Sequence, residues 1–302
     1  MSVATLRSDL RPEPVRLGTP SDGRTVPASG RADGAAEVAF ARHGEVTRLA
    51  HLYQRDPCRV LFPRPARAEP AAAVLVTTSG GVVGGDRLRF AIAAGAGARC
   101  SVTTQAAEKI YRSAGTDSRI TITVDAGPGA TLEWMPQETI LFDGARLRRS
   151  TAIALAGDAR LIAGEIAVFG RRARGERFGR GLFCESWRVR RDGRLVWADG
   201  LRLDGDVAET LDRPAAFAGA AALASMIYAG GDAAARLAAA RGWLDRLPGD
   251  LRAGASCLGE VLLIRVLGRD PQEVRSGFGE VWAALRAEAL GFPAAPPRIW
   301  NG

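Results

Sequence analysis

Lysine is almost absent from this chain of 302 residues: Lys109 is the single lysine among 41 basic residues. The basic residues outnumber the 33 acidic ones and give a formal charge of +8, carried almost entirely by arginine. Arginines spread so evenly along a sequence are typical of a solvated surface. No recognised nucleic-acid-binding motif accompanies the charge, so we expect no nucleic-acid partner. A basic DNA-binding module remains a third hypothesis, and it predicts binding that falls steeply with salt.

Thiol and imidazole groups are also scarce. The four cysteines lie far apart and include no C-x-x-C pair, which excludes a zinc ribbon and a thioredoxin-like site. Scattered thiols in a chain of this length predict a reduced, cytoplasmic protein. The two histidines, His43 and His51, have no metal-ligand spacing, and we expect them to be surface or hydrogen-bonded residues. No G-x-S-x-G motif occurs, so no serine hydrolase is indicated.

Long apolar runs are missing as well. The longest uncharged, mostly apolar stretch is AAFAGAAALASMIYAGG at 215–231, and it is rich in alanine and glycine. It is shorter than the roughly 20 strongly apolar residues that a membrane helix needs. The first twenty residues carry several charges and lack the apolar core of a secretory signal. We therefore expect no membrane partner and a cytoplasmic location.

Short strand patterns separated by turns dominate residues 36–210. ITITV at 120–124 alternates with period two, and Asp192-Gly193 lies between two such segments and predicts a hairpin. Strand patterns that recur every eight to twelve residues or so favour an all-β layered core over a βαβ array. Residues 1–35 contain four prolines and no periodicity, which predicts a flexible N-terminal tail. We expect residues 36–302 to form a single β-rich domain.

Helical patterns appear only after residue 211. The segment 231–247 predicts a helix with Asp232 as its N-cap. A second helix is predicted over 271–291, with a proline at its first position and a glycine at its end. Between them, 257–270 reads as one buried strand. The expected fold is therefore mainly β, with a few C-terminal helices.

A glycine-rich loop, TTSGGVVGGDRLRF at 77–90, raises the possibility of a nucleotide site. Gly80 and Gly85 have the spacing of a phosphate-binding loop, but Asp86 stands where that loop requires a lysine. A strand-like segment follows where the helix should begin, so no helix N-terminus would face a phosphate. The loop reads as a tight connection between strands that places Asp86. A nucleotide-binding enzyme that uses the Gly80–Gly85 loop remains the alternative hypothesis.

Carboxylates in apolar surroundings are the most informative polar residues. A carboxylate within an apolar strand is costly unless it is paired or bound to a cation. Abundant arginines make salt bridges the first explanation, and a channel lined by oxygen ligands for a divalent ion is the other. Lys109, with Glu108 and Tyr111, reads as a surface patch. The candidate carboxylates are Asp86, Glu138, Asp143, Glu165 and Asp199.

Four sequence strings resemble one known family in their order and content. TTSGGVVGGDRL, VTTQAAEKIYRS, LEWMPQETILFDGA and the C-terminal PPRIW are similar to segments of the UreD (UreH) family of urease accessory proteins. The resemblance spans about residues 36–300. It implies right-handed stacking of β-strands with a few helices, and it favours a strand near 220–228.

The resemblance also implies a function that is not catalytic. Members of the family act as scaffold chaperones for nickel insertion: they bind apo-urease and UreF, and UreF recruits the GTPase UreG. No cofactor is expected to bind tightly, and Ni²⁺ is expected in transit through a tunnel. On this basis the five candidate carboxylates become candidate tunnel-lining residues. The absence of a His or Cys cluster fits transit better than storage.

Overall fold

The computed structural model describes residues 30–66 and 68–301. Most of the predicted tail, residues 1–29, lies outside the described residues. Strand β1 (Asp33–His43) begins within the last residues of the stretch that was predicted to be tail. From there the chain forms two large β-sheets, which we name sheet A and sheet B.

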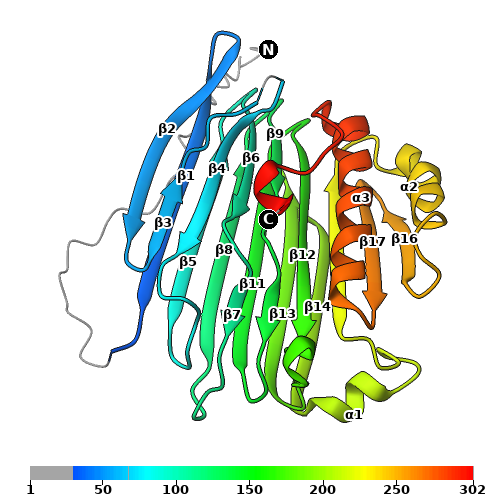
Figure 1. Ribbon diagram of the computed structural model, residues 1–302. Helices are drawn as coiled ribbons and strands as arrows, with labels where there is room; N and C mark the ends of the chain where they lie inside the picture. The colour runs from blue at the N-terminus through cyan, green and yellow to red at the C-terminus, as the bar shows by residue number, and fades with distance from the viewer. Residues whose placement is uncertain (1–29, 67, 302) are drawn as a thin grey trace, which may run out of the picture. The chain divides into compact units, whose positions relative to one another are not determined.

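Sheet A contains seven strands in the order β14-β13-β11-β8-β5-β1-β2 (Figure 1). Its five inner strands are parallel, and an antiparallel hairpin closes each edge. The β13–β14 hairpin turns at Asp192-Gly193, both with positive φ, as the sequence predicts. Besides β1, its strands are β2 (Val46–Arg55), β5 (Arg87–Ala94), β8 (Ser118–Ala126), β11 (Arg146–Leu155), β13 (Arg180–Arg191) and β14 (Arg194–Asp206).

Sheet B follows the order β16-β17-β15-β12-β9-β6-β4-β3. Strands β4, β6, β9 and β12 are parallel, and antiparallel strands flank them. These eight strands are β3 (Cys58–Leu61), β4 (Ala71–Thr77), β6 (Arg99–Thr104), β9 (Thr131–Trp134), β12 (Arg160–Phe169), β15 (Ala222–Ala229), β16 (Arg252–Leu258) and β17 (Val261–Gly268). Two short strands, β7 (Glu108–Ile110) and β10 (Thr139–Leu141), pair in parallel with each other, and β10 also pairs with the end of β12.

From β4 to β13 the chain passes alternately between the two sheets. Each pass lays a strand parallel to the one from the previous turn, so the strands stack as a β-solenoid of about four turns. Half of the residues are in strands and 16% are in helices. The predicted mainly β fold of stacked strands with a few C-terminal helices is confirmed.

Helix α3 (Pro271–Leu290) lies on the outer face of sheet B, against β12, β15 and β17 (Figure 1). Asp270 caps the helix by accepting a hydrogen bond from the N–H of Gln272 at 2.8 Å. Gly291 ends it with a φ of 62°, as the sequence predicts. The fully buried Arg286 of α3 binds Glu133 of β9 at 2.8 Å, which fixes the helix to the sheet.

The C-terminal PPRIW motif anchors the end of the chain over sheet B. It contains the short helical turn η3 (Arg298–Asn301). Trp300 donates its indole N–H to the hydroxyl of Thr103 at 2.9 Å and packs between Phe278 and Trp282 of α3. The motif is therefore part of the core beneath α3.

Two predictions for residues 231–270 are wrong in detail. Helix α2 (Leu237–Leu244) is shorter than predicted and follows the turn η2 (Ala234–Arg236). Asp232 does not cap it, because its carboxylate accepts from the Tyr228 hydroxyl and pairs with Arg236. Gly259, with a φ of 57°, turns the chain between β16 and β17, so a hairpin replaces the single predicted strand.

The remaining helical segments are the short η1 (Arg172–Arg174) and α1 (Val207–Asp212). No helix in the described part of the chain has both the length and the apolar character of a membrane span.

The glycine loop connects β4 to β5 as a strand-to-strand connection. Val82 forms a parallel bridge with Ile110 and so extends the β7–β10 ladder into the preceding turn. The carboxylate of Asp86 accepts the N–H groups of Ala32 and Val83 at 2.8 and 2.9 Å. The segment that follows is β5 and not a helix, so the loop lacks the geometry of a phosphate-binding loop.

The first two glycines of this loop, Gly80 and Gly81, differ in the space around them, so their alanine substitutions form a matched pair. A Cβ on Gly81 (φ 146°) would lie 2.4 Å from the Tyr111 ring and 2.8 Å from the Lys109 carbonyl oxygen. A Cβ on Gly80 (φ 75°) would meet nothing within 4 Å. We expect Gly81→Ala to lower the free energy of unfolding by about 3 kcal/mol and Gly80→Ala by about 1 kcal/mol. Urea unfolding measures both, and equal losses would contradict this account of the loop.

Candidate functional site

The space between sheets A and B, which we call the lumen, is mostly apolar but is crossed by one group of polar side chains. Period-two alternation turns every second residue inward; on β11, for example, Arg149 points inward with Leu147 and Ile153. On β12, Glu165 has the same phase as Ala163 and Ala167. We call the inward polar group the lumen belt: Glu108, Thr139, Arg149, Thr151, Glu165, Glu185, Asp199, Ser225 and Arg265.

Arg149 lies at the centre of the lumen belt and joins the two sheets. It contacts Glu185 of β13 through two hydrogen bonds, of 2.7 Å from Nε and 2.5 Å from Nη2. Two residues of the opposite sheet also contact Arg149. The Thr139 hydroxyl accepts a hydrogen bond from Nη1 of Arg149 at 2.6 Å, and the Glu165 carboxylate accepts one from Nη2. The indole N–H of Trp187 lies 3.2 Å from both carboxylates. The three charged side chains are only 3–13% exposed.

Two carboxylates share this one guanidinium, so the cluster cannot be neutral if both ionise. Burial, and then the nearby charge of Glu185, raises the pKa of Glu165 well above its usual range. The pKa of Arg149 is raised although burial opposes its charge, because the charges of Glu185 and Glu165 lie beside it. We infer that Glu165 favours its protonated form more strongly than an exposed glutamate does.

A cavity of about 160 Å³ connects this cluster with the glycine loop. Thr139 and Arg149 line its inner part together with buried Trp134, and Gly80, Gly81 and Glu108 also line it. The exposed Gln105 and Ala106 belong to the same lining, so the cavity reaches the surface. Glu108 pairs in register with Thr139 of the next turn, which places the two polar residues in neighbouring positions.

Towards the other end, the lumen belt reaches the last strands of both sheets. Asp199 of β14 forms an ion pair with Arg265 of β17, and their side chains are 34% and 42% exposed. Asp199 is paired in register with Trp187, and Arg265 with Ser225, which in turn pairs with Glu165. The buried hydroxyl oxygen of Thr151 has no hydrogen-bond partner among the described residues. The hydrogen-bonding capacity of this hydroxyl is therefore unused within the described residues.

The structure separates the five carboxylates predicted from the sequence. Glu165 and Asp199 belong to the lumen belt, and Asp86 lies near enough to Glu108 for its charge to contribute to the raised pKa of Glu108. Glu138 pairs with Arg275 of α3, on the outer side of sheet B. Asp143 accepts the N–H groups of Gly179 and Arg180, both at 3.0 Å, and thereby closes a turn. Glu138 and Asp143 therefore lie outside the lumen belt.

The described residues contain no preformed metal centre. Among residues 30–66 and 68–301, no group of three or more His, Cys, Asp or Glu side chains could hold a metal ion. Burial raises the pKa of the Cys58 thiol to about 12, so it stays protonated. The imidazole of His51 already has a hydrogen-bonding partner, the carboxylate of Glu37 at 3.0 Å. A cation in the lumen would meet carboxylate and hydroxyl oxygens of the described residues without a complete cage of ligands.

Arg149 and Glu185 are not among the site residues predicted from the sequence, and Glu108 is read there as part of a surface patch. The period-two alternation does predict that Arg149 and Glu185 point inward. In FCESWRV, Glu185 has the phase of Phe183 and Trp187, and all three point into the lumen. Arg149 lies in RLRRS, where only its phase separates it from the exposed arginines nearby. Glu108 depends on the stacking of turns, which no local pattern reveals.

Comparisons with known proteins find relatives along nearly the whole described chain. Over residues 32–301, from β1 to η3, the sequence matches the family described as UreD urease accessory protein. It is 46% identical over 272 residues to the urease accessory protein UreD of Magnetococcus marinus, an alignment that covers 89% of this chain and 93% of the relative. It is 44% identical over 282 residues to the urease accessory protein UreD 2 of Methylorubrum populi, with 92% and 93% covered.

Glu108 allows a test of the cavity through the pH dependence of stability. Burial is the main cause that raises its pKa from 4.5 to about 7. Between pH 4.5 and about 7, Glu108 is mostly protonated in the folded protein and ionised in the unfolded chain. The contribution of this proton to stability is therefore complete below pH 4.5 and is lost as the pH rises through about 7. Because glutamine stays neutral, Glu108→Gln should raise Tm relative to the parent more at pH 8 than at pH 5.

Differential scanning fluorimetry at the two pH values measures this difference. Glu45→Gln is the control, because the side chain of Glu45 is 90% exposed. Its effect on Tm should be nearly the same at both pH values. A Glu108→Gln effect that is equally independent of pH would show that Glu108 is not buried at the cavity.

Proposed function

The chain belongs to the UreD family of urease accessory proteins, and from this premise we propose that it is a non-catalytic scaffold for nickel insertion into apo-urease. In this role it binds apo-urease and UreF, and UreF brings UreG. Nickel is the cargo of the assembly and not a resident cofactor. The proposal assigns GTP binding to UreG, consistent with a glycine loop here that leads into a strand.

The lumen belt is the observation that carries the nickel-transit part of the proposal. Its polar residues follow one another from the cavity at Glu108, through the Arg149 cluster, to the partly exposed Asp199. Carboxylate and hydroxyl oxygens suit a hard divalent cation, and few of them at each step would bind it weakly. Weak binding at successive positions is what transit requires, because a complete cage would retain the ion.

The residues of the Arg149 cluster have distinct roles in this proposal. Glu165 releases its proton when the cation binds. The departing proton offsets part of the charge of the cation, so the net charge of the buried site changes less than if the cation bound to a carboxylate that was already ionised. Arg149 holds both carboxylates in place through its hydrogen bonds. The free hydroxyl of Thr151 and that of Ser225 offer neutral oxygens beyond the cluster.

The alternative of a nucleotide-binding enzyme has little support. The loop from Gly80 to Gly85 precedes β5, and both carboxylate oxygens of Asp86 are engaged by backbone N–H groups. No donor array for phosphate is formed there. We therefore base the proposal on the lumen and not on the glycine loop.

A double substitution within the lumen belt tests the transit path. Glu165→Gln with Asp199→Asn keeps the shapes of both side chains but removes two carboxyl groups that could bind the cation. We expect at least about a tenfold fall in nickel bound by urease after activation, by analogy with the cost of altering groups around a metal. The matched control, Glu209→Gln with Asp212→Asn, makes the same chemical changes at exposed ion pairs on α1. It should leave nickel content unchanged.

Nickel content is read by elemental analysis of purified urease, and scaffold assembly by co-purification of apo-urease and UreF. Normal assembly with low nickel is the expected result. Normal nickel content with a folded double variant would refute the lumen path. If the parent chain recovered neither apo-urease nor UreF, the scaffold role itself would be wrong.

A further inference from the structure

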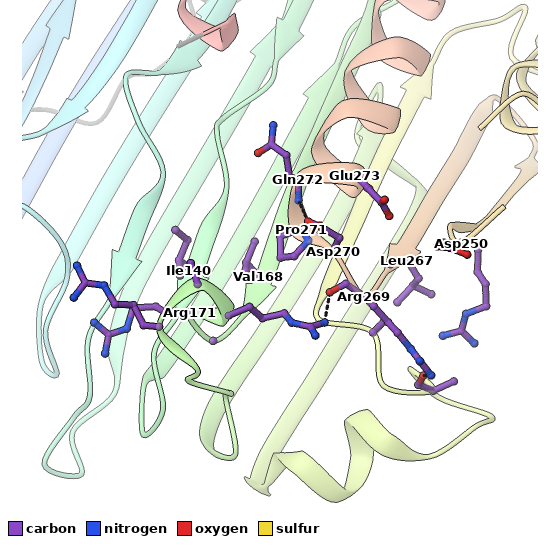
Figure 2. Close-up of a pocket in the computed structure, with 18 residues that line it drawn as sticks. Ile140, Val168, Arg171, Asp250, Leu267, Arg269, Asp270, Pro271, Gln272 and Glu273 are labelled. Carbon is purple, nitrogen blue, oxygen red and sulfur yellow. Dashed lines mark hydrogen bonds between the residues drawn. The ribbon is translucent and has the colours of Figure 1, made fainter. Parts of the chain in front are cut away.

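A large groove lies outside the lumen, on the outer side of sheet B beyond the start of α3. Its volume is about 1120 Å³, and its lining comes from β10, β12, η1, the segment before β15, the end of β17 and the first turn of α3. Figure 2 shows Arg171 and Arg269 on opposite sides of the groove, with Ile140 and Val168 between them. The lumen belt contributes none of the lining residues.

The floor of the groove continues the apolar core that α3 covers elsewhere. Val168 belongs to the core between sheet B and α3, and Ile140 packs against that core. Helix α3 begins at Pro271, so beyond this residue the same face of the sheet is no longer under the helix (Figure 2). The floor therefore presents apolar side chains in a setting where a further segment could pack on them.

The walls of the groove are basic. Five arginines face three carboxylates, those of Asp250, Asp270 and Glu273, and Asp270 is already engaged as the N-cap of α3. Arg171 is paired with Glu176 and lies 4.1 Å from the centre of the Phe142 ring. The other four arginines form no ion pair with any described residue: Arg172, Arg174, Arg252 and Arg269.

The size of the groove favours a chain segment over a small ligand. Pockets for small molecules generally range from about 300 to 1000 Å³ and are mostly apolar. This groove is larger and combines an apolar floor with exposed arginines on its walls. Arg172, Arg252 and Arg269 each donate to a backbone carbonyl but have no carboxylate partner among the described residues. A segment with one apolar face and carboxylates along its edges would cover the floor and supply the four arginines with counter-charges.

We propose that this groove is a docking site for an acidic amphipathic segment of a partner protein. The inference goes beyond nickel transit and does not depend on it. Charge complementarity selects the occupant: carboxylates meet Arg172 and Arg174 on one wall and Arg252 and Arg269 on the other. Apolar side chains of the segment pack on Ile140 and Val168.

A synthetic peptide tests the groove without any urease protein. The probe is fluorescein-labelled LEELLEELLEELLE, whose leucines fall on one helical face. A scrambled peptide of the same composition lacks this face and controls for charge alone. The groove variant is Arg174→Glu with Arg269→Glu. The control is Arg48→Glu with Arg188→Glu, which reverses two exposed arginines on sheet A and lowers the net charge equally.

Fluorescence anisotropy at physiological salt gives the affinities, and circular dichroism confirms that each variant is folded. We expect the parent chain to bind the probe more tightly than the scrambled peptide. The groove variant should bind the probe about tenfold more weakly or worse, and the control should change little. Three results would each overturn the proposal: no binding by the parent chain, equal binding of the scrambled peptide, or equal losses in the two variants. If the peptide binds as expected but urease activated with the lumen double variant has a normal nickel content, only the transit proposal falls.

Discussion

The burial of Arg149 is the constraint on which the interior of this solenoid depends. A guanidinium between two sheets must be neutralised and fully hydrogen-bonded, because an isolated buried charge costs many kcal/mol. Glu185 supplies the counter-charge from the same sheet, and Thr139 and Glu165 approach from the other. Polar contacts therefore hold the two sheets together around Arg149, whereas apolar packing fills the rest of the lumen.

Stability alone does not account for such a cluster. Well-packed apolar residues of similar volume are often as stabilising as a buried ion pair, or more so. The cluster also contains one carboxylate more than the arginine can neutralise, and burial raises the pKa of Glu165. A buried acid with an exchangeable proton, next to the unsatisfied hydroxyl of Thr151, suits a site that receives a cation from time to time. The nickel-transit proposal gives this arrangement a purpose.

Local pattern predicts much of the fold but less of the site. Alternation identified the strands, and Pro271 with Gly291 located α3, because caps and side-chain phase are properties of neighbouring residues. The β16–β17 hairpin was missed because Gly259 turns a continuous apolar segment that reads as one strand. Glu165 was recognised by its apolar neighbours, whereas Arg149 is hidden among other arginines. Local pattern does not place Glu138 on the outward face of sheet B, because that face is also buried, under α3.

The outer groove and the lumen belt lie on different sides of sheet B and serve separate proposals. Sheet B is apolar on both faces, one facing the lumen and the other facing α3. Beyond the start of α3 at Pro271, the outer face is flanked by arginines and is not covered by a helix. One sheet could thus hold a transit path on one side and a partner segment on the other.

The central claim is that a divalent cation enters the lumen between the two sheets. The most direct measurement is anomalous diffraction at the nickel absorption edge from crystals of this protein soaked in Ni²⁺. We predict an anomalous peak inside the lumen between Glu165 and Glu185, which is lost in Glu165→Gln crystals. Anomalous peaks confined to surface residues such as His43 and His51, with none in the lumen, would contradict the account.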